Sequence, residues 1–191
     1  MHIFMCLIVA VDKAWAIGKK GRLLIKNKYD LERFKSLTIG KVIVYGRKTL
    51  ETFPDGKPLP DRTNIILTRD PNYVVEGAIV VHSLEELDVV LNQLQAEQGK
   101  EKKLQVFVCG GASVYEQLLP RCEIAYVTHF DAKIEGADAF FPRLDKMPNW
   151  RMITGKNEPL KVSYKDKDED GAPMTMEFAT WVNDKPQKIV D

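Results

Sequence analysis

Apolar, β-branched runs alternate along most of this chain with segments of helical periodicity, and this alternation limits the possible folds more than any other feature. The runs are mostly apolar, which is typical of strands buried on both faces of a sheet. Strands joined by helices usually run parallel. We therefore predict an α/β fold with a largely parallel central sheet, whose strands are Phe4–Val11, Val42–Tyr45, Asn64–Thr68, Ala78–Val81, Gln105–Cys109 and Ile124–Phe130.

The last third of the chain has the shorter period of antiparallel strands. Apolar and polar residues alternate at Val162 and Tyr164, and again over Thr175–Trp181, on either side of the polar stretch Asp166–Pro173. This pattern predicts an antiparallel C-terminal hairpin that closes one edge of the sheet. No linker or repeat interrupts the chain, so we expect residues 1–191 to form a single domain.

The composition favours a small-molecule ligand. Lys and Arg number 28 against 27 Asp and Glu, without a long block of like charge, so we expect no nucleic-acid partner. The longest apolar run, Ile3–Val11, is about half of a membrane span, so we expect no membrane association. The three cysteines lie in or beside apolar stretches without a Cys-x-x-Cys pair, which favours reduced thiols in a cytoplasmic protein. We expect this protein to be a monomer.

A calcium-binding motif near the C-terminus is interpreted as accidental. Asp166–Gly171 and Glu177 match the specified positions of an EF-hand loop. An EF-hand needs a helix on each side, whereas these flanks have the period of strands, and Pro173 stands inside the loop. An acidic hairpin tip accounts for the same residues, so we predict no metal site.

The helix after the first strand carries a candidate catalytic acid. Asn27 is a typical N-cap for this helix. Asp30, Phe34 and Leu37 then fall on one face. Asp30 either completes the cap and complements the helix dipole, or lies beside Phe34 in an apolar cleft. In the second case burial raises its pKa, and the carboxyl group can hydrogen-bond or protonate a polar heterocycle.

Two strand ends carry groups that suit a phosphate. The first strand end is followed by Gly46, Arg47, Lys48 and Thr49, and the second by Thr68 and Arg69. The segments fit a phosphate cradle at the carboxyl ends of parallel strands, although solvated basic turns have the same composition. The three cations together favour a cofactor with an extra ribose phosphate, NADPH over NADH.

A glycine pair follows another predicted strand. The strand Gln105–Cys109 runs into Gly110 and Gly111, and a helix begins directly afterwards. Without side chains, the backbone amides can approach a pyrophosphate. A tight strand-to-helix turn without a ligand is the alternative.

Seven segments, in order and spacing, resemble the dihydrofolate reductase family from Ile8 to at least Trp181. The resemblance implies a three-layer fold and hydride transfer from NADPH to dihydrofolate, which gives tetrahydrofolate. The segments are Val9–Asp12, Ala16–Gly18, Asp30–Lys35, Gly46–Glu51, Leu59–Ile65, Gly110–Tyr115 and Thr128–Asp131.

On the substrate side, the resemblance implies that Asp30 pairs with the amino-amidine edge of the pterin and helps to deliver a proton to its imine nitrogen through water. Thr128 would bond Asp30 and the pterin amino group, as the second catalytic residue. Arg62 would clamp the glutamate carboxylate. The implied substrate-binding residues are Ile8, Val9, Asp30, Phe34, Phe53, Leu59, Arg62, Cys109, Tyr115 and Thr128.

On the cofactor side, the resemblance implies that Ala10 and Ile17 flank the nicotinamide. The family also has a cis peptide bond between its two glycines, here Gly110 and Gly111. The implied cofactor-binding residues are Ala10, Ile17, Gly18, Gly46, Arg47, Lys48, Thr49, Leu67, Thr68, Arg69, Gly110, Gly111, Ala112, Ser113 and Val114.

One segment departs from the family. Leu23-Leu24-Ile25 stands where most members carry Leu-Pro-Trp. The indole of that tryptophan normally helps to hold a water near the pterin, so Ile25 alters the expected proton route and leaves the hydride geometry untouched. Lys28 would lower the pKa of Asp30 if it pointed inward, but a lysine there is expected to be solvated.

Two other functions fit part of the sequence. A flavin-pathway pyrimidine reductase shares the general fold and the use of NADPH, but its substrate has no glutamate tail for Arg62 to bind. A cofactor-binding protein without turnover would account for the missing tryptophan.

Overall fold

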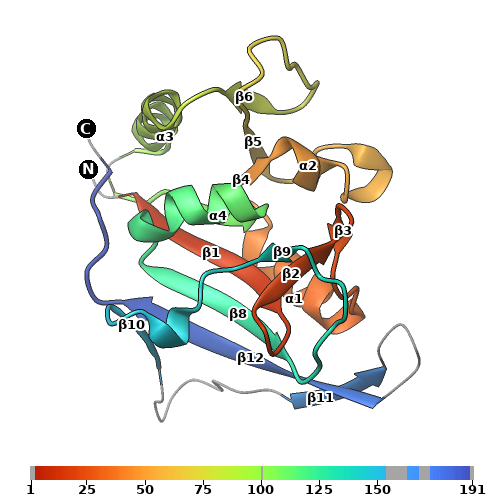
Figure 1. Cartoon of the computed structure of the whole chain (residues 1–191). Helices are drawn as coiled ribbons and strands as arrows, with labels where there is room; N and C mark the ends of the chain where they lie inside the picture. Colours follow the sequence, from red (N-terminus) through yellow and green to blue (C-terminus); the bar gives the residue numbers. More distant parts are fainter. Residues whose placement is uncertain (1–2, 100, 154–162, 168–172, 190–191) are drawn as a thin grey trace.

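The computed structural model describes residues 3–99, 101–153, 163–167 and 173–189, and for residues 163–167 it describes the backbone alone. Its centre is a nine-stranded sheet in the order β10-β12-β8-β1-β7-β4-β5-β6, with β11 beside β12 (Figure 1). The strands from β8 to β6 pair in parallel, which confirms the predicted α/β fold. They are β1 (Phe4–Val11), β4 (Val42–Gly46), β5 (Thr63–Leu67), β6 (Ile79–Val81), β7 (Gln105–Gly110) and β8 (Ile124–Phe130).

Antiparallel strands close the other edge of the sheet. Strand β12 (Pro173–Asn183) pairs with β8, and β11 (Ser163–Lys167) and β10 (Trp150–Met152) pair with β12. The predicted C-terminal hairpin is therefore confirmed, while Val162 lies outside the described residues. Strands flank the EF-hand-like sequence on both sides, and residues 168–172 of that sequence are also outside the described part.

Two layers of helices cover the sheet (Figure 1). Along β1, the odd-numbered side chains from Met5 to Val11 join the core cluster under α3 (Leu84–Gln98) and α4 (Ala112–Leu118). The even-numbered Cys6 and Ile8 join a second cluster, with Phe34 and Leu37 of α1 (Lys28–Thr38). Each fully buried aliphatic side chain stabilises such a core by about 1.5–3 kcal/mol. The three-layer arrangement follows from this period-two alternation.

Both long helices begin at a side-chain cap, and the cap at Asn27 is the one that the sequence predicts. The Asn27 side chain accepts hydrogen bonds from the amides of Tyr29 and Asp30. The Ser83 hydroxyl accepts from the amide of Glu86, and α3 ends at Gly99, where φ is 91°. These caps fix where α1 starts, and with it the height of Asp30 above the sheet.

A small second sheet stands beside the carboxyl end of β1. It contains β2 (Ala16–Lys19), β3 (Arg22–Leu23) and β9 (Ala139–Phe140). The buried Asp12 carboxylate, 1% exposed, fastens this sheet to the core, since it accepts from the amides of Ala14, Ala16 and Ile134. The remaining helical turns are α2 (Arg47–Leu50) and the 3₁₀ segments Pro54–Gly56, Leu119–Arg121 and Leu144–Lys146.

Within the described residues, no helix is long and apolar enough to cross a membrane. Cys6, Cys109 and Cys122 are all free thiols.

Candidate active site

The carboxyl ends of the parallel strands β1, β4, β5, β7 and β8 meet at one edge of the sheet, where α/β proteins bind their ligands. Helix α1 lies on one side of this edge, and the turn from β7 into α4 lies on the other (Figure 1). The candidate residues from the sequence gather here in two groups. One group surrounds Asp30, and the other surrounds the glycine pair.

Asp30 is held by Thr128 across the sheet surface. The Thr128 hydroxyl, on β8, donates to the Asp30 carboxylate at 2.6 Å. Thr128 is 1% exposed, so this hydrogen bond is shielded from bulk water. The amides at the start of α1 are already capped by Asn27, which leaves the carboxyl group of Asp30 for the cleft. The structure thus favours the cleft interpretation of Asp30 over the capping interpretation.

Burial raises the pKa of the Asp30 carboxyl above its usual value. The hydrogen bond from Thr128 and the positive charge of Arg33 act in the opposite direction and limit the rise. Lys28 is exposed, with its Nζ 5.6 Å from the ring centre of Tyr29, as expected for a solvated lysine. The site therefore holds a carboxyl group whose proton affinity is greater than that of a surface aspartate.

Apolar side chains form a wall beside the helix that carries Asp30. They belong to the second core cluster, in which Tyr45 supports Phe53 through an edge-on ring contact with centres 4.8 Å apart. This wall can take a flat heterocycle and an aryl group while excluding water from the acid. Its members from the predicted substrate site are Ile8, Phe34, Phe53, Leu59 and Cys109.

Two predicted substrate residues approach the site from the opposite layer. The side chains of Val9 and Tyr115 belong to the core cluster under α3 and α4. The Tyr115 hydroxyl donates to the backbone carbonyl of Ile8 on β1 at 2.6 Å. Tyr115 therefore fixes the backbone of β1 beside the cleft, whereas the Val9 side chain is not brought into it.

Arg62 is fixed at the far end of α1. Its Nε donates to the Thr38 hydroxyl at 2.9 Å, and Nη1 donates to the carbonyl of Pro60 at 2.6 Å. Thr38 in turn donates to the carbonyl of Phe34, so the helix that carries Asp30 also orients the guanidinium. A planar cation held in this way suits a carboxylate ligand.

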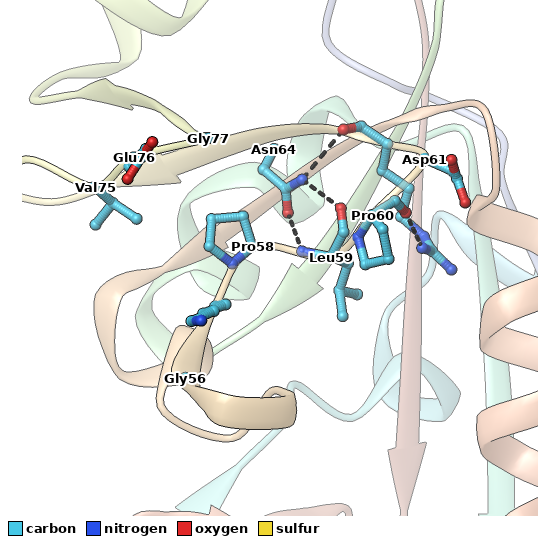
Figure 2. Close-up of a pocket in the computed structure, with 11 residues that line it drawn as sticks. Gly56, Pro58, Leu59, Pro60, Asp61, Asn64, Val75, Glu76 and Gly77 are labelled. Atoms are coloured by element: carbon cyan, nitrogen blue, oxygen red, sulfur yellow. Dashed lines mark hydrogen bonds between the residues drawn. The ribbon is translucent and has the colours of Figure 1, made fainter.

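The buried side chain of Asn64 supports the loop before Arg62 (Figure 2). It accepts from the Tyr45 hydroxyl at 2.9 Å and the Leu59 amide at 3.0 Å, and donates to the Leu59 carbonyl at 2.8 Å and the Arg62 carbonyl at 3.2 Å. A cavity of about 560 Å³ lies along this loop and does not include Asp30 or Phe34. It is lined by residues 56–62, Asn64 and residues 75–77.

The glycines form a close-packed cradle between β4 and β7. A methyl group added at Gly46 would lie 3.2 Å from Cγ2 of Val114, and one at Gly111 would lie 3.6 Å from the Thr49 hydroxyl. The peptide bond between Gly110 and Gly111 is cis, as the resemblance implies. The first hydrogen bond of α4 joins the Val114 amide to the Gly111 carbonyl, so the amides of Ala112 and Ser113 precede it.

The predicted phosphate-binding cations follow β4 and β5. Arg47 and Lys48 are exposed on α2, directly after Gly46, which pairs with Leu67 at the end of β5. Arg69 is exposed two residues after Leu67, and Thr68 lies between them. A weak ion pair with Asp70, 3.8 Å from Nη1, and a ring contact with Tyr73 at 5.8 Å hold Arg47 over this edge.

The remaining predicted residues lie on β1 and β2. Ala10 pairs with Thr128 in the sheet, one residue before the end of β1. Ile17 and Gly18 are on β2, which Asp12 ties to β1 through the bonds described above. Ile25 packs in an apolar cluster with Ala10 and Phe178.

Sequence reasoning missed Arg33, Asp12 and Asn64 as supports of the site. Each had a signal: Arg33 is one helical turn after Asp30, and Asp12 and Asn64 are polar residues at the end of or inside apolar runs.

Comparisons with known proteins agree with this geometry. Residues 4–181 match the family model described as dihydrofolate reductase. A dihydrofolate reductase of Staphylococcus haemolyticus is 37% identical over 148 residues, which are 78% of this chain and 81% of that protein. Dihydrofolate reductase type 3 of Salmonella typhimurium is 33% identical over 164 residues, 85% of this chain and 93% of that protein.

A solved structure shows the same fold. The dihydrofolate reductase from Enterococcus faecalis complexed with NADP(H) and RAB-propyl has a TM-score of 0.71 and 31% identity, and the match covers 94% of this chain and 96% of that one. The fold and the site define an α/β oxidoreductase with a half-buried aspartate and a glycine cradle at the carboxyl ends of its parallel strands. The chain belongs to the dihydrofolate reductase family.

Proposed function

We propose how the residues of this site divide the work of an enzyme that reduces 7,8-dihydrofolate to 5,6,7,8-tetrahydrofolate with NADPH. The family match and the complexed Enterococcus faecalis structure carry the reaction and the cofactor. They favour this activity over a flavin-pathway pyrimidine reductase and over a binding protein without turnover. The observation that carries the assignment of residues is the shielded hydrogen bond between Thr128 and Asp30 beside an apolar wall.

Asp30 is the proposed acid of the reaction. Its carboxylate accepts two N–H groups from the amino-amidine edge of the pterin, a fork-shaped donor that matches a carboxylate. Because burial raises its pKa, Asp30 also supports protonation of the neighbouring imine nitrogen near neutral pH. Thr128 keeps one carboxylate oxygen in place while this occurs.

Substrate orientation comes from the wall and from Arg62. Ile8, Phe34 and Phe53 enclose the pterin and benzoyl groups, with Leu59 and Cys109 at the margins. Arg62 pairs with the glutamate carboxylate, and the hydrogen bond from its Nε to Thr38 orients the guanidinium plane. Val9 contributes through its backbone alone, and Tyr115 through the Ile8 carbonyl.

The cradle fits a dinucleotide phosphate. The close contact at Gly46 leaves no room for a side chain, and the amides of Ala112 and Ser113 precede the first hydrogen bond of α4. Arg47, Lys48 and Arg69 supply the charge for the extra phosphate of NADPH. When bound, NADPH supplies the hydride. Ala10, Ile17 and Gly18 hold the nicotinamide end, and Leu67, Thr68, Thr49, Gly110, Gly111 and Val114 complete the proposed cofactor site.

The test of this function is a direct assay. NADPH absorbance should fall only after dihydrofolate is added. If the three cations bind the extra phosphate of NADPH, the enzyme should use NADH at least about tenfold less efficiently. Turnover of a pyrimidine substrate without a glutamate tail, or tight NADPH binding without any turnover, would contradict it.

We propose, further, that the chain works as a monomer, folded as one domain, in the cytoplasm. One sheet takes strands from β1 through β12, which supports a single domain. Three free thiols in or beside the sheet support a reducing compartment. Sedimentation at micromolar concentration tests the monomer, and a mass of two chains would refute it.

A further inference from the structure

A half-buried cation lies behind the candidate acid. Arg33 follows Asp30 by one turn of α1, so the two side chains project from neighbouring positions on the helix. The guanidinium carbon of Arg33 is 4.3 Å from the ring centre of Phe178 on β12 and 5.6 Å from that of Tyr126 on β8. Helix α1 and the two aromatic rings therefore hold the guanidinium against the sheet.

This position is costly for an arginine. Nη1 of Arg33 is buried and has no hydrogen-bond partner among the described residues. Burial lowers the pKa of Arg33, while the negative charge of Asp30 acts in the opposite direction. An arginine keeps its charge under such conditions, so a positive charge remains near Asp30 in a poorly solvated place. Charges interact more strongly there than in water.

We propose that Arg33 is a positioning residue for proton delivery: its guanidinium, clamped on Phe178 and Tyr126, stabilises the ionised form of Asp30 and so sets the pH range in which the acid works. The proposal rests on the proposed role of Asp30. Arg33 does not contact substrate in this scheme. Its effect is exerted through the carboxylate.

The other groups around Asp30 leave Arg33 as the cation with most influence among the described residues. Lys28 is exposed and near the ring of Tyr29. Burial raises the pKa values of Tyr115 and Cys109 well above their usual values, so both are neutral near pH 7. The groups that face the site from the packed elements are Arg33 from α1, Tyr126 and Thr128 from β8, Tyr115 from α4 and Cys109 from β7; β12 contributes the aromatic ring of Phe178.

The direction of the effect follows from the signs. Burial raises the pKa of Asp30, and Arg33 lowers it. Removal of the cation therefore raises the pKa of Asp30 further. The rate of proton-dependent reduction falls as pH rises through this pKa, so the fall moves to higher pH when Arg33 becomes neutral. A nearby opposite charge typically shifts a carboxyl pKa by about one unit or more.

The experiment measures the single-turnover rate of NADPH oxidation from about pH 5 to pH 9 in the wild type, Arg33→Met and Arg33→Lys. Arg33→Met should move the midpoint of the fall upward by about one pH unit, and Arg33→Lys, which keeps the charge, should show less than about half of that shift. Lys35→Met removes an exposed cation from the same helix and should leave the midpoint where it is. An unchanged midpoint in Arg33→Met would overturn the proposal and leave Arg33 a packing residue.

Two further variants keep the result interpretable. Phe178→Leu removes the ring under the guanidinium without changing any charge, and should shift the midpoint in the same direction as Arg33→Met if the clamp is needed. If the pH profile of Phe178→Leu equals that of the wild type, the Phe178 ring is not needed to hold the guanidinium. If the proposed role of Asp30 is wrong, Asp30→Asn keeps its activity. This result distinguishes a failure of the proposed function from a failure of the role proposed for Arg33.

Discussion

At the scale of single residues, the site depends on one polar contact made in an apolar place. The hydrogen bond from Thr128 to Asp30 joins residues 98 positions apart and holds the acid against a wall of hydrocarbon. Burial and hydrogen bonding act on Asp30 with opposite signs, and the balance leaves its pKa above the usual value. The acid is therefore poised for proton transfer nearer to neutral pH than a surface aspartate.

Replacing Asp30 with Asn should reduce turnover by about a hundredfold or more, because the amide keeps the shape of the side chain but cannot supply a proton. Steady-state assays at pH 7, with circular dichroism to verify folding, measure this. The matched control is Glu32→Gln, an exposed carboxylate on the same helix. Asp30→Asn with wild-type turnover would remove Asp30 from the reaction.

Replacing Thr128 with Val should raise the pKa of Asp30, since the hydrogen bond that favours the carboxylate is lost. The fall of activity with rising pH should then move upward, and Thr128→Ser, which keeps the hydroxyl, should stay close to the wild type. The measurement is kcat against pH in the three proteins. A downward move in Thr128→Val would contradict the assigned direction.

Ile25 packs against an apolar cluster, at the position where the family resemblance implies a tryptophan. Replacing Ile25 with Trp adds an N–H donor in the cluster with Ala10 and Phe178, and should change the affinity for antifolates that compete with dihydrofolate. Inhibition constants of the two proteins measure the effect. Equal constants would show that the residue at this position does not influence the pocket.

At the scale of elements, the proposed cofactor site results from two strands that end beside each other. β4 and β7 pair in parallel, so Gly46 and the Gly110–Gly111 turn meet at one edge. Space there is limited by Val114 from α4, 3.2 Å from where a Cβ of residue 46 would lie. A side chain at residue 46 would press against this helix, whereas the glycine leaves the backbone of the strand end open to a close approach.

This contact can be tested by a pair of substitutions. Gly46→Ala should weaken NADPH binding at least tenfold, because the new methyl group displaces Val114 and the cradle with it. The double variant Gly46→Ala with Val114→Ala should recover part of the lost affinity, since the second change removes the clashing methyl. Fluorescence titration with NADPH measures both. Equal loss in the single and double variants would show that the methyl blocks the ligand directly.

At the scale of the whole molecule, the sequence predicted those parts whose signal is local. Strands such as β1 and β8 were located to the residue, because each is a mostly apolar, β-branched or aromatic run. The short strands β3, β9 and β10 were not predicted, since two or three residues carry no detectable period. The Asp30–Thr128 contact was implied only by family resemblance, because no local pattern reveals which strand a helix will cover.

Contacts that stabilise the whole fold also orient the site. A substitution at Asn64 tests whether stability and substrate binding depend on the same contacts. Its buried amide links Tyr45 of β4 to the loop that carries Leu59 and Arg62. Asn64→Ala leaves several buried polar groups unsatisfied, so it should lower the free energy of unfolding by about 2–4 kcal/mol. Tyr45→Phe removes one of these bonds and should cost about 1 kcal/mol.

Urea denaturation measures both losses, and dihydrofolate titration measures the link to Arg62. Asn64→Ala should weaken dihydrofolate binding with little change in NADPH binding, because the loop it supports faces the substrate side of the sheet edge. Equal losses for both ligands would show that the substitution disturbs the sheet as a whole. A stable variant with unaltered dihydrofolate affinity would show that the loop keeps its shape through the backbone bonds of its own turns.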